Sequence, residues 1–133
     1  MGGVQRMDQK DPAYETGMTV RREMFGPSGA ELRLAQATDF NRPFEDLVTR
    51  YCFGDIWARP GLDRKTRSLI TLAALTALTK PNQLRVHVRG ALANGCSVEE
   101  IREVLMHTSI YAGIPAGVEA FSAAAEVLKS EGL

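Results

Sequence analysis

From Asp63 to the C-terminus, helix start and stop signals follow one another at short intervals along the sequence. Asp63 is a favourable N-cap ahead of a long apolar stretch, and Pro81 suits the first turn of the next helix. Gly95 is placed to end that helix. Ser97, with Glu100 three residues later, has the capping-box spacing that begins another. These signals predict a series of helices joined by short connections.

The rest of the chain adds further helices and no strand. Periodic apolar residues predict helices over residues 12–24, 39–53 and 116–129, with an irregular connector at 54–60. In the helix at 39–53, apolar residues at steps of three and four form one stripe, and no alternating run of β-branched residues is present. The sequence therefore predicts an all-α bundle of about six helices.

Size and composition favour one globular domain. The 133 residues suffice for one core, which we place at 12–133 after a disordered lead at 1–11. Sixteen basic and sixteen acidic residues balance to zero, which argues against nucleic acid and membrane surfaces as partners. With neither a signal peptide nor an apolar run near the roughly 20 residues of a membrane helix, we expect a cytoplasmic protein.

The stretch from Leu69 to Leu78 is apolar on nearly every face, which predicts a central, enclosed helix. A chain this small encloses a helix on all sides only with difficulty. We therefore expect a partner subunit to cover part of this helix, with the active cleft near that interface.

His87 is the most informative polar residue, because it lies on an apolar helical stripe formed by Leu84, His87, Val88, Ala91 and Leu92. Two interpretations are open. The imidazole is a core group satisfied by one hydrogen bond, or it is a desolvated acid/base with a pKa tuned by its surroundings.

Other polar residues carry similar pairs of interpretations. Arg85 and Arg89 share a different face of the same helix, as a solvated basic edge or as a clamp for a substrate carboxylate. Tyr111 ends the stripe of its own helix, where it packs or turns its hydroxyl to a site.

The connector at 54–60 brings together Asp55, Trp57 and Arg59. An anion, a large ring and a guanidinium on a loop form a plausible pocket wall. The alternative is a tryptophan that fills a core gap beside a surface Asp–Arg pair.

Motifs for cofactors and metals are absent from the sequence. Only two histidines occur, without HExxH or a Cys/His cluster, so we expect no metal site. Neither GxGxxG nor GxxxxGK[ST] occurs, and the two cysteines do not form CxxC. We therefore expect no cofactor.

Long stretches of the chain resemble the carboxymuconolactone decarboxylase family, in its short single-domain branch. They comprise GMTVRREMFG, DFNRPFEDLVTRY, FGDIWARPGLDRKTRSLITLAALTALTKPNQLRVHVRGALANG and CSVEEIREVLMHTSIYAGIPAGVEAF. The GDIWARPGLDRKTRSL and LRVHVRGAL blocks are the most specific to that branch.

The resemblance implies an AhpD-like helical subunit in a ring-like homo-oligomer, commonly a hexamer, with a trimer as the alternative. It also implies a carboxy-lyase that converts 4-carboxymuconolactone to 3-oxoadipate enol-lactone without a cofactor, within protocatechuate degradation (the β-ketoadipate pathway). The partner would be a small carboxylated lactone. Asp55 stands where the family has glutamate, and His107 where glutamine is usual.

For this reaction we assign hypothetical roles to the residues above. His87 donates the proton or stabilises the oxyanion, and Arg85 anchors a carboxylate. Asp55 orients His87 or presses on the departing carboxylate, and Trp57 walls the substrate ring. The remaining substrate-binding candidates are Arg59, Arg67, Arg89 and Tyr111.

Two other functions are weighed. AhpD-like thiol peroxidases use a CxxC pair and an upstream glutamate, but the matching positions here are Lys80, Gln83 and Ser68. A disulfide relay needs two thiols, so this alternative is disfavoured. The third possibility is a helical oligomer that binds a small acid without catalysis.

Overall fold

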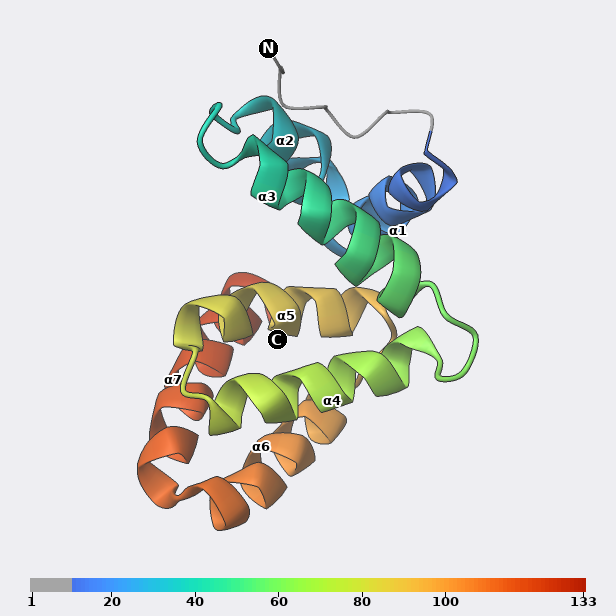
Figure 1. The fold of residues 1–133 in the computed structure, drawn as a ribbon. Helices are drawn as coiled ribbons and strands as arrows, with labels where there is room; N and C mark the ends of the chain where they lie inside the picture. The colour runs from blue at the N-terminus through green and yellow to red at the C-terminus, as the bar shows by residue number, and fades with distance from the viewer. Residues whose placement is uncertain (1–10) are drawn as a thin grey trace. The chain divides into compact units, whose positions relative to one another are not determined.

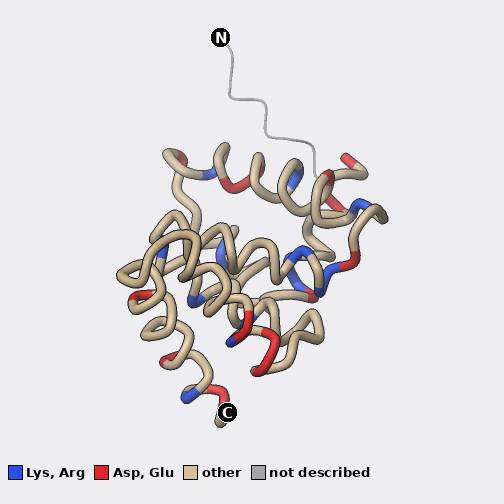
Figure 2. Tube along the Cα trace, turned by 90° about the horizontal axis from the view of Figure 1, so that it is seen from below, with Lys and Arg blue, Asp and Glu red and all other residues tan. Residues whose placement is uncertain are grey.

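The structure, a computed structural model, describes residues 11–133 and contains only helices within that range. The predicted all-α class is confirmed, with seven α-helices and one π-helix among the described residues (Figure 1). The chain divides into two compact units at Gly61 and Leu62. The prediction of a single domain over 12–133 stays a prediction. Figure 2 shows acidic and basic residues interspersed along both units, in keeping with the zero net charge.

Over residues 11–61 the first unit contains four helices: α1 (Pro12–Gly29), α2 (Glu31–Ala35), α3 (Arg42–Leu47) and the π-helix η1 (Val48–Trp57). Asp11 caps α1, because its Oδ1 accepts a hydrogen bond from the Ala13 amide at 3.0 Å. The predicted disordered lead was therefore wrong at Asp11, and its positions 1–10 lie outside the described residues.

The breaker cluster after residue 24 divides α1 into two helical runs at Gly26. Gly26 has φ of 72°, a left-handed conformation open to glycine. Helical structure resumes through Pro27 to Gly29. The predicted end of the first helical run near residue 24 is therefore confirmed, whereas the helical residues 27–29 and the short α2 that follow were not predicted.

The π-helix η1 replaces the first half of the predicted connector. It extends α3 without a break to Trp57, although Gly54 has low helix propensity. A Cβ atom on Gly17 would lie 1.9 Å from the Thr49 carbonyl oxygen, and one on Gly54 would lie 2.2 Å from that of Ala13. The backbones of α1 and η1 thus touch where both lack side chains. This contact supports η1 through Gly54.

The apolar stripe predicted for this segment faces outward. Phe40, Phe44 and Tyr51 are exposed, whereas Glu45 and Thr49 are buried. Much of the buried side of α3 and η1 is polar and bonds to α1. The small apolar core of the unit instead contains Val20, Met24, Phe53 and Trp57.

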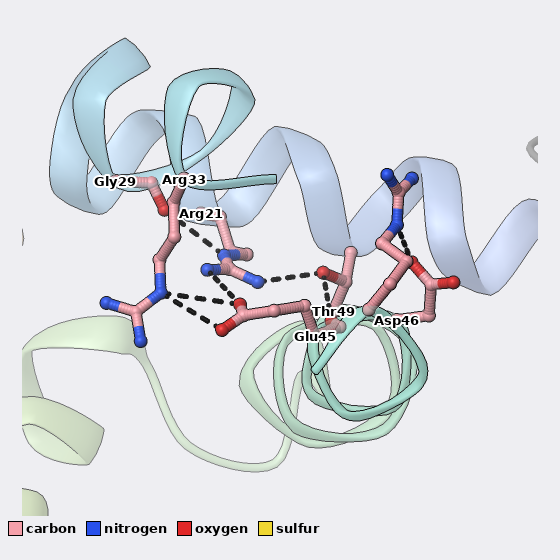
Figure 3. A network of polar contacts seen from close by, with 7 residues as sticks. Arg21, Gly29, Arg33, Glu45, Asp46 and Thr49 are labelled. Carbon is pink, nitrogen blue, oxygen red and sulfur yellow. Dashed lines mark hydrogen bonds and ion pairs between the residues drawn. The ribbon is translucent and has the colours of Figure 1, made fainter. Parts of the chain in front are cut away.

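Arg21 of α1 joins these buried polar groups (Figure 3). Its guanidinium donates to Thr49 Oγ1 at 2.9 Å, to Glu45 Oε1 at 3.1 Å and to the Gly29 carbonyl at 3.3 Å. The Arg33 Nε also donates to Glu45 Oε2, at 3.2 Å. Both buried charges are therefore paired, as buried charges must be.

The second unit is a bundle of α4 (Arg64–Ala77), α5 (Pro81–Ala93), α6 (Val98–Ala112) and α7 (Ile114–Ser130). α5 packs between α4 and α7, and α6 also packs on both of them. The predicted caps are confirmed: Asp63 accepts from the Thr66 amide at 2.7 Å, and Ser97 and Glu100 form a capping box. Gly95 has φ of 92° after the end of α5.

The apolar helix α4 is only partly enclosed by its own chain. Leu72 is fully buried, but Ile70 and Leu78 are 52% and 65% exposed. This agrees with the expectation that a single chain does not enclose the helix on all sides. Cover by a partner subunit stays a prediction. Among residues 11–133, no helix is long and apolar enough to cross a membrane.

Candidate functional site

His87 lies at the edge of the apolar seam of α5. Leu84 and Val88 on the same helix are buried, while His87 itself is half-buried. Burial disfavours the charged imidazolium and lowers the pKa of His87 from 6.5 to about 4. At neutral pH the substrate-free imidazole is therefore uncharged, with one N–H to donate and one nitrogen to accept.

Arg85 is held by α7 and by its own helix. Its Nε donates to Glu126 Oε2 at 2.8 Å and its Nη1 donates to Asn82 Oδ1 at 2.9 Å. The hydrogen bond from Arg85 lowers the pKa of the Glu126 carboxyl. One turn later, Arg89 lies 3.7 Å from Glu131 in a second ion pair. The two arginines thus form a basic edge of α5, and each of them is paired with a glutamate, Glu126 or Glu131.

Arg85 and His87 lie on different sides of α5. Two residues along an α-helix turn by about 200°, and Arg85 reaches α7. The structure therefore does not bring these two predicted catalytic residues onto one face of the helix.

The side of α5 that carries His87 turns toward α4. Asn94 follows His87 by seven residues, or about two helical turns, so it lies on the same side. Its Nδ2 donates to Ser68 Oγ of α4 at 3.0 Å. Arg67 precedes Ser68 and is half-buried near the start of α4. Among the predicted arginines of this unit, Arg67 is therefore the one on the helix that the His87 side faces.

Asp55, Trp57 and Arg59 belong to the first unit. Trp57 is buried and stacks on Phe53, with ring centroids 6.2 Å apart and planes at 25°. Asp55 and Arg59 are exposed at and just beyond the end of η1. The placement of Trp57 matches the alternative of a core-filling ring. The roles of all three at a substrate stay predictions.

Tyr111 ends α6 and is 82% exposed. Its ring centroid lies 5.2 Å from that of His107, one turn earlier, with the planes tilted by 35°. Tyr111 therefore does not pack into the core, and its predicted contact with substrate stays a prediction.

Sequence reasoning missed an open groove between α6 and α7. It has a volume of about 740 Å³ and is lined by Glu103, Met106, His107, Ser109, Ile110, Ile114, Gly117, Val118 and Phe121. A signal was present in the sequence, because Met106 and Ile110 are apolar but do not share the helix face of the buried Ile101, Leu105 and Thr108. The Glu126 partner of Arg85 had no such signal, because it lies 41 residues away in the sequence.

Comparison with known proteins gives a consistent set of matches. The model of the carboxymuconolactone decarboxylase family matches residues 42–126. A 4-carboxymuconolactone decarboxylase of Acinetobacter baylyi is 41% identical over 120 residues, which are 90% of each chain. A nitrosuccinic acid decarboxylase of Metarhizium robertsii is 41% identical over 107 residues, 80% of this chain and 75% of the relative. A 4-carboxymuconolactone decarboxylase of Pseudomonas putida is 39% identical over 49 residues, 37% of this chain and all of the relative's sequence.

Proposed function

Because the chain belongs to the carboxymuconolactone decarboxylase family, we propose that it removes carbon dioxide from 4-carboxymuconolactone or a closely similar carboxylated acid. Family membership confirms the resemblance found in the sequence. The observation that carries the proposal is the 41% identity over 90% of both chains with a relative of that named activity. The product would be 3-oxoadipate enol-lactone, formed in the cytoplasm during protocatechuate breakdown.

The names of two relatives suggest a wider substrate class. One is named for a carboxylated lactone and the other for nitrosuccinic acid. In both acids a carbonyl or nitro group can accept the electron pair that a departing carboxylate leaves behind. The proposed substrate class is therefore a small acid with at least two acidic groups and its own electron sink. Such an acid needs no cofactor to delocalise the charge.

The reaction asks three things of the protein. The bond from carbon to the departing carboxylate breaks, carbon dioxide leaves, and the electron pair moves onto the conjugated oxygen. A proton then adds to carbon. The protein must hold the remaining carboxylate, stabilise the oxyanion and allow this proton transfer in a site that excludes water.

His87 is the proposed group at the oxyanion. Its lowered pKa supports the neutral form, whose N–H donates to the developing negative charge. The alternative role of proton donor requires an imidazolium. The negative charge of a bound substrate favours that form, since a nearby anion raises the pKa of histidine.

Arg67 is the proposed anchor for the carboxylate nearest His87, because it lies on the helix that this side of α5 faces. Arg85 reaches toward α7, where it donates to Glu126, and Arg89 lies beside Glu131. Arg59, Asp55, Trp57 and Tyr111 remain candidates for contacts with the rest of the substrate.

The proposed enzyme is a homo-oligomer, a trimer or a hexamer. The support is the exposed apolar surface of α4 at Ile70 and Leu78. Burial of such surface between subunits is favourable.

The test is an assay of carbon dioxide release and product absorbance with 4-carboxymuconolactone and, separately, with nitrosuccinate. The assay omits cofactors and includes a sample with blocked thiols. His87→Asn is expected to lower turnover about 10²–10⁴-fold, while His107→Asn serves as the matched control and keeps it. Carbon dioxide release that survives thiol blocking would exclude the thiol-dependent alternative, and ligand binding without turnover would indicate the non-catalytic one.

A further inference from the structure

The α6–α7 groove is an unusually apolar surface for an exposed position. Ile110, Ile114 and Val118 are 75%, 62% and 63% exposed. They line the groove together with Met106 and Phe121. Contiguous apolar surface of this kind marks an interaction site.

The base of the groove is firm. A Cβ atom on Gly117 would lie 2.1 Å from Ser109 Oγ, so α6 and α7 touch directly behind the groove. Ser109 Oγ in turn donates to the Leu105 carbonyl at 2.6 Å. Gly113, with φ of 108°, is the one residue between the two helices. The surface is therefore preformed, which reduces the cost of ordering it on binding.

The exposed stripe of α6 along this groove has two different ends. It runs through positions 103, 106, 107, 110 and 111, the three- and four-residue spacing of one helix face. Glu103 stands at one end, and Tyr111 at the other beside His107. A hydrogen-bond acceptor with a negative charge thus lies about two turns from a hydroxyl donor, with apolar side chains between them.

We propose that a second copy of this chain covers the α6–α7 groove, with its α6 antiparallel to the first α6 about a two-fold axis near His107. In this arrangement Glu103 of each copy faces the position of Tyr111 in the other. Met106 and Ile110 meet apolar residues of the partner. Of the two assemblies proposed above, a hexamer with two-fold axes allows this contact and a cyclic trimer does not; the inference rests on that part of the proposed function.

Polar complementarity favours a second copy over a small ligand. An isologous interface requires that one surface be complementary to itself. Here Glu103 at one end of the stripe can accept a hydrogen bond from Tyr111 of the second copy, and Tyr111 at the other end can donate to Glu103 of that copy. The groove is open, and its polar residues stand along α6 while α7 contributes mainly apolar side chains.

The first test measures mass against concentration by light scattering and sedimentation. Ile110→Glu combined with Val118→Glu is expected to raise the subunit dissociation constant by at least about 100-fold, because each interface would bury carboxylates without partners. Both native side chains are well exposed in the single chain, so folding is preserved. The control is Leu32→Glu, which changes an apolar side chain that is 50% exposed on α2.

The second test places a cysteine at the proposed axis. His107→Cys in a Cys52→Ser background is expected to form a disulfide-linked dimer on oxidation, whereas Arg102→Cys, on another face of α6, is not. Unchanged mass in the double glutamate variant, or equal cross-linking at 102 and 107, would overturn the assignment.

Carbon dioxide release in the same samples separates the two proposals. A monomeric wild type that decarboxylates normally refutes the interface and leaves the decarboxylase proposal standing. An inactive wild type whose mass falls in the groove variant supports the interface and counts against the decarboxylase.

Discussion

The lowered pKa of His87 makes the stability of the protein sensitive to acid. The folded state binds the proton of His87 with a pKa of about 4, against 6.5 as its ordinary value. Between these values the unfolded chain binds more protons at this position than the folded chain does. Stability from the neutral buried imidazole is therefore complete above pH 6.5 and is lost as the pH falls toward 4.

The size of this loss follows from the shift. The difference from 6.5 to about 4 is 2.5 pH units, and each unit corresponds to roughly 1.4 kcal/mol. At pH 4 the folded site is half protonated, so the expected loss there is about 3 kcal/mol. That is a large part of the roughly 5–15 kcal/mol typical of a folded domain.

The assay is urea unfolding of the wild type and of His87→Gln at several pH values from 7.5 to about 4. Subtracting the two free energies of unfolding removes the titration of carboxyl groups common to both, such as Glu126. The advantage of the wild type over the variant is expected to shrink by about 3 kcal/mol over this range. Proton NMR of the two histidines, with His107→Gln to assign the resonances, measures the pKa directly. A difference that stays constant from pH 7.5 to 4 would refute the desolvation argument.

Three further predictions concern catalysis and packing. If neutral His87 stabilises the oxyanion, kcat/KM stays constant from pH 6 to 8. If the free enzyme must instead carry the imidazolium, kcat/KM falls tenfold for each unit of increasing pH. A pH-rate profile distinguishes the two roles. Arg67→Lys is expected to raise KM by at least about tenfold, because lysine cannot make the planar bidentate contact of a guanidinium with a carboxylate. Arg85→Lys is expected to raise KM less. If steady-state kinetics show the reverse order, Arg85 is the carboxylate anchor. Gly54→Ala is expected to destabilise the protein by about 3 kcal/mol, because its methyl group would clash with the Ala13 carbonyl oxygen. A melting temperature of the variant equal to that of the wild type would contradict this.

Local signals in the sequence were sufficient where the structure depends on neighbours along the chain. The Asp63 cap, the Ser97 capping box and the glycine after α5 each act within a few residues, and all three are confirmed. Helical spacing also placed His87 beside the buried Leu84 and Val88, although it did not show that the imidazole is only half-buried.

The errors arose where a distant residue decides the outcome. The burial of Glu45 on α3 was not predicted, because it depends on Arg21, which lies 24 residues earlier in the sequence. The π-helix continues because Gly17 meets its backbone, a contact between separate helices. At the candidate site, helical spacing placed Arg85 on a basic edge but gave no indication of Glu126 as its partner. Contacts of this kind depend on the tertiary structure and cannot be inferred from local sequence patterns.

The five-residue α2 has consequences for how the first unit responds to ionic strength. Helices this short do not nucleate by themselves in water. Side-chain ion pairs, Arg22 with Glu31 and Arg33 with Glu45, tether it to its surroundings, and three of those four side chains are about half exposed. Dissolved salt weakens such tethers, while the buried guanidinium of Arg21 is shielded from it. In concentrated salt we therefore expect α2 to be the first helix of this unit to unfold locally, while the other helices of the unit stay folded.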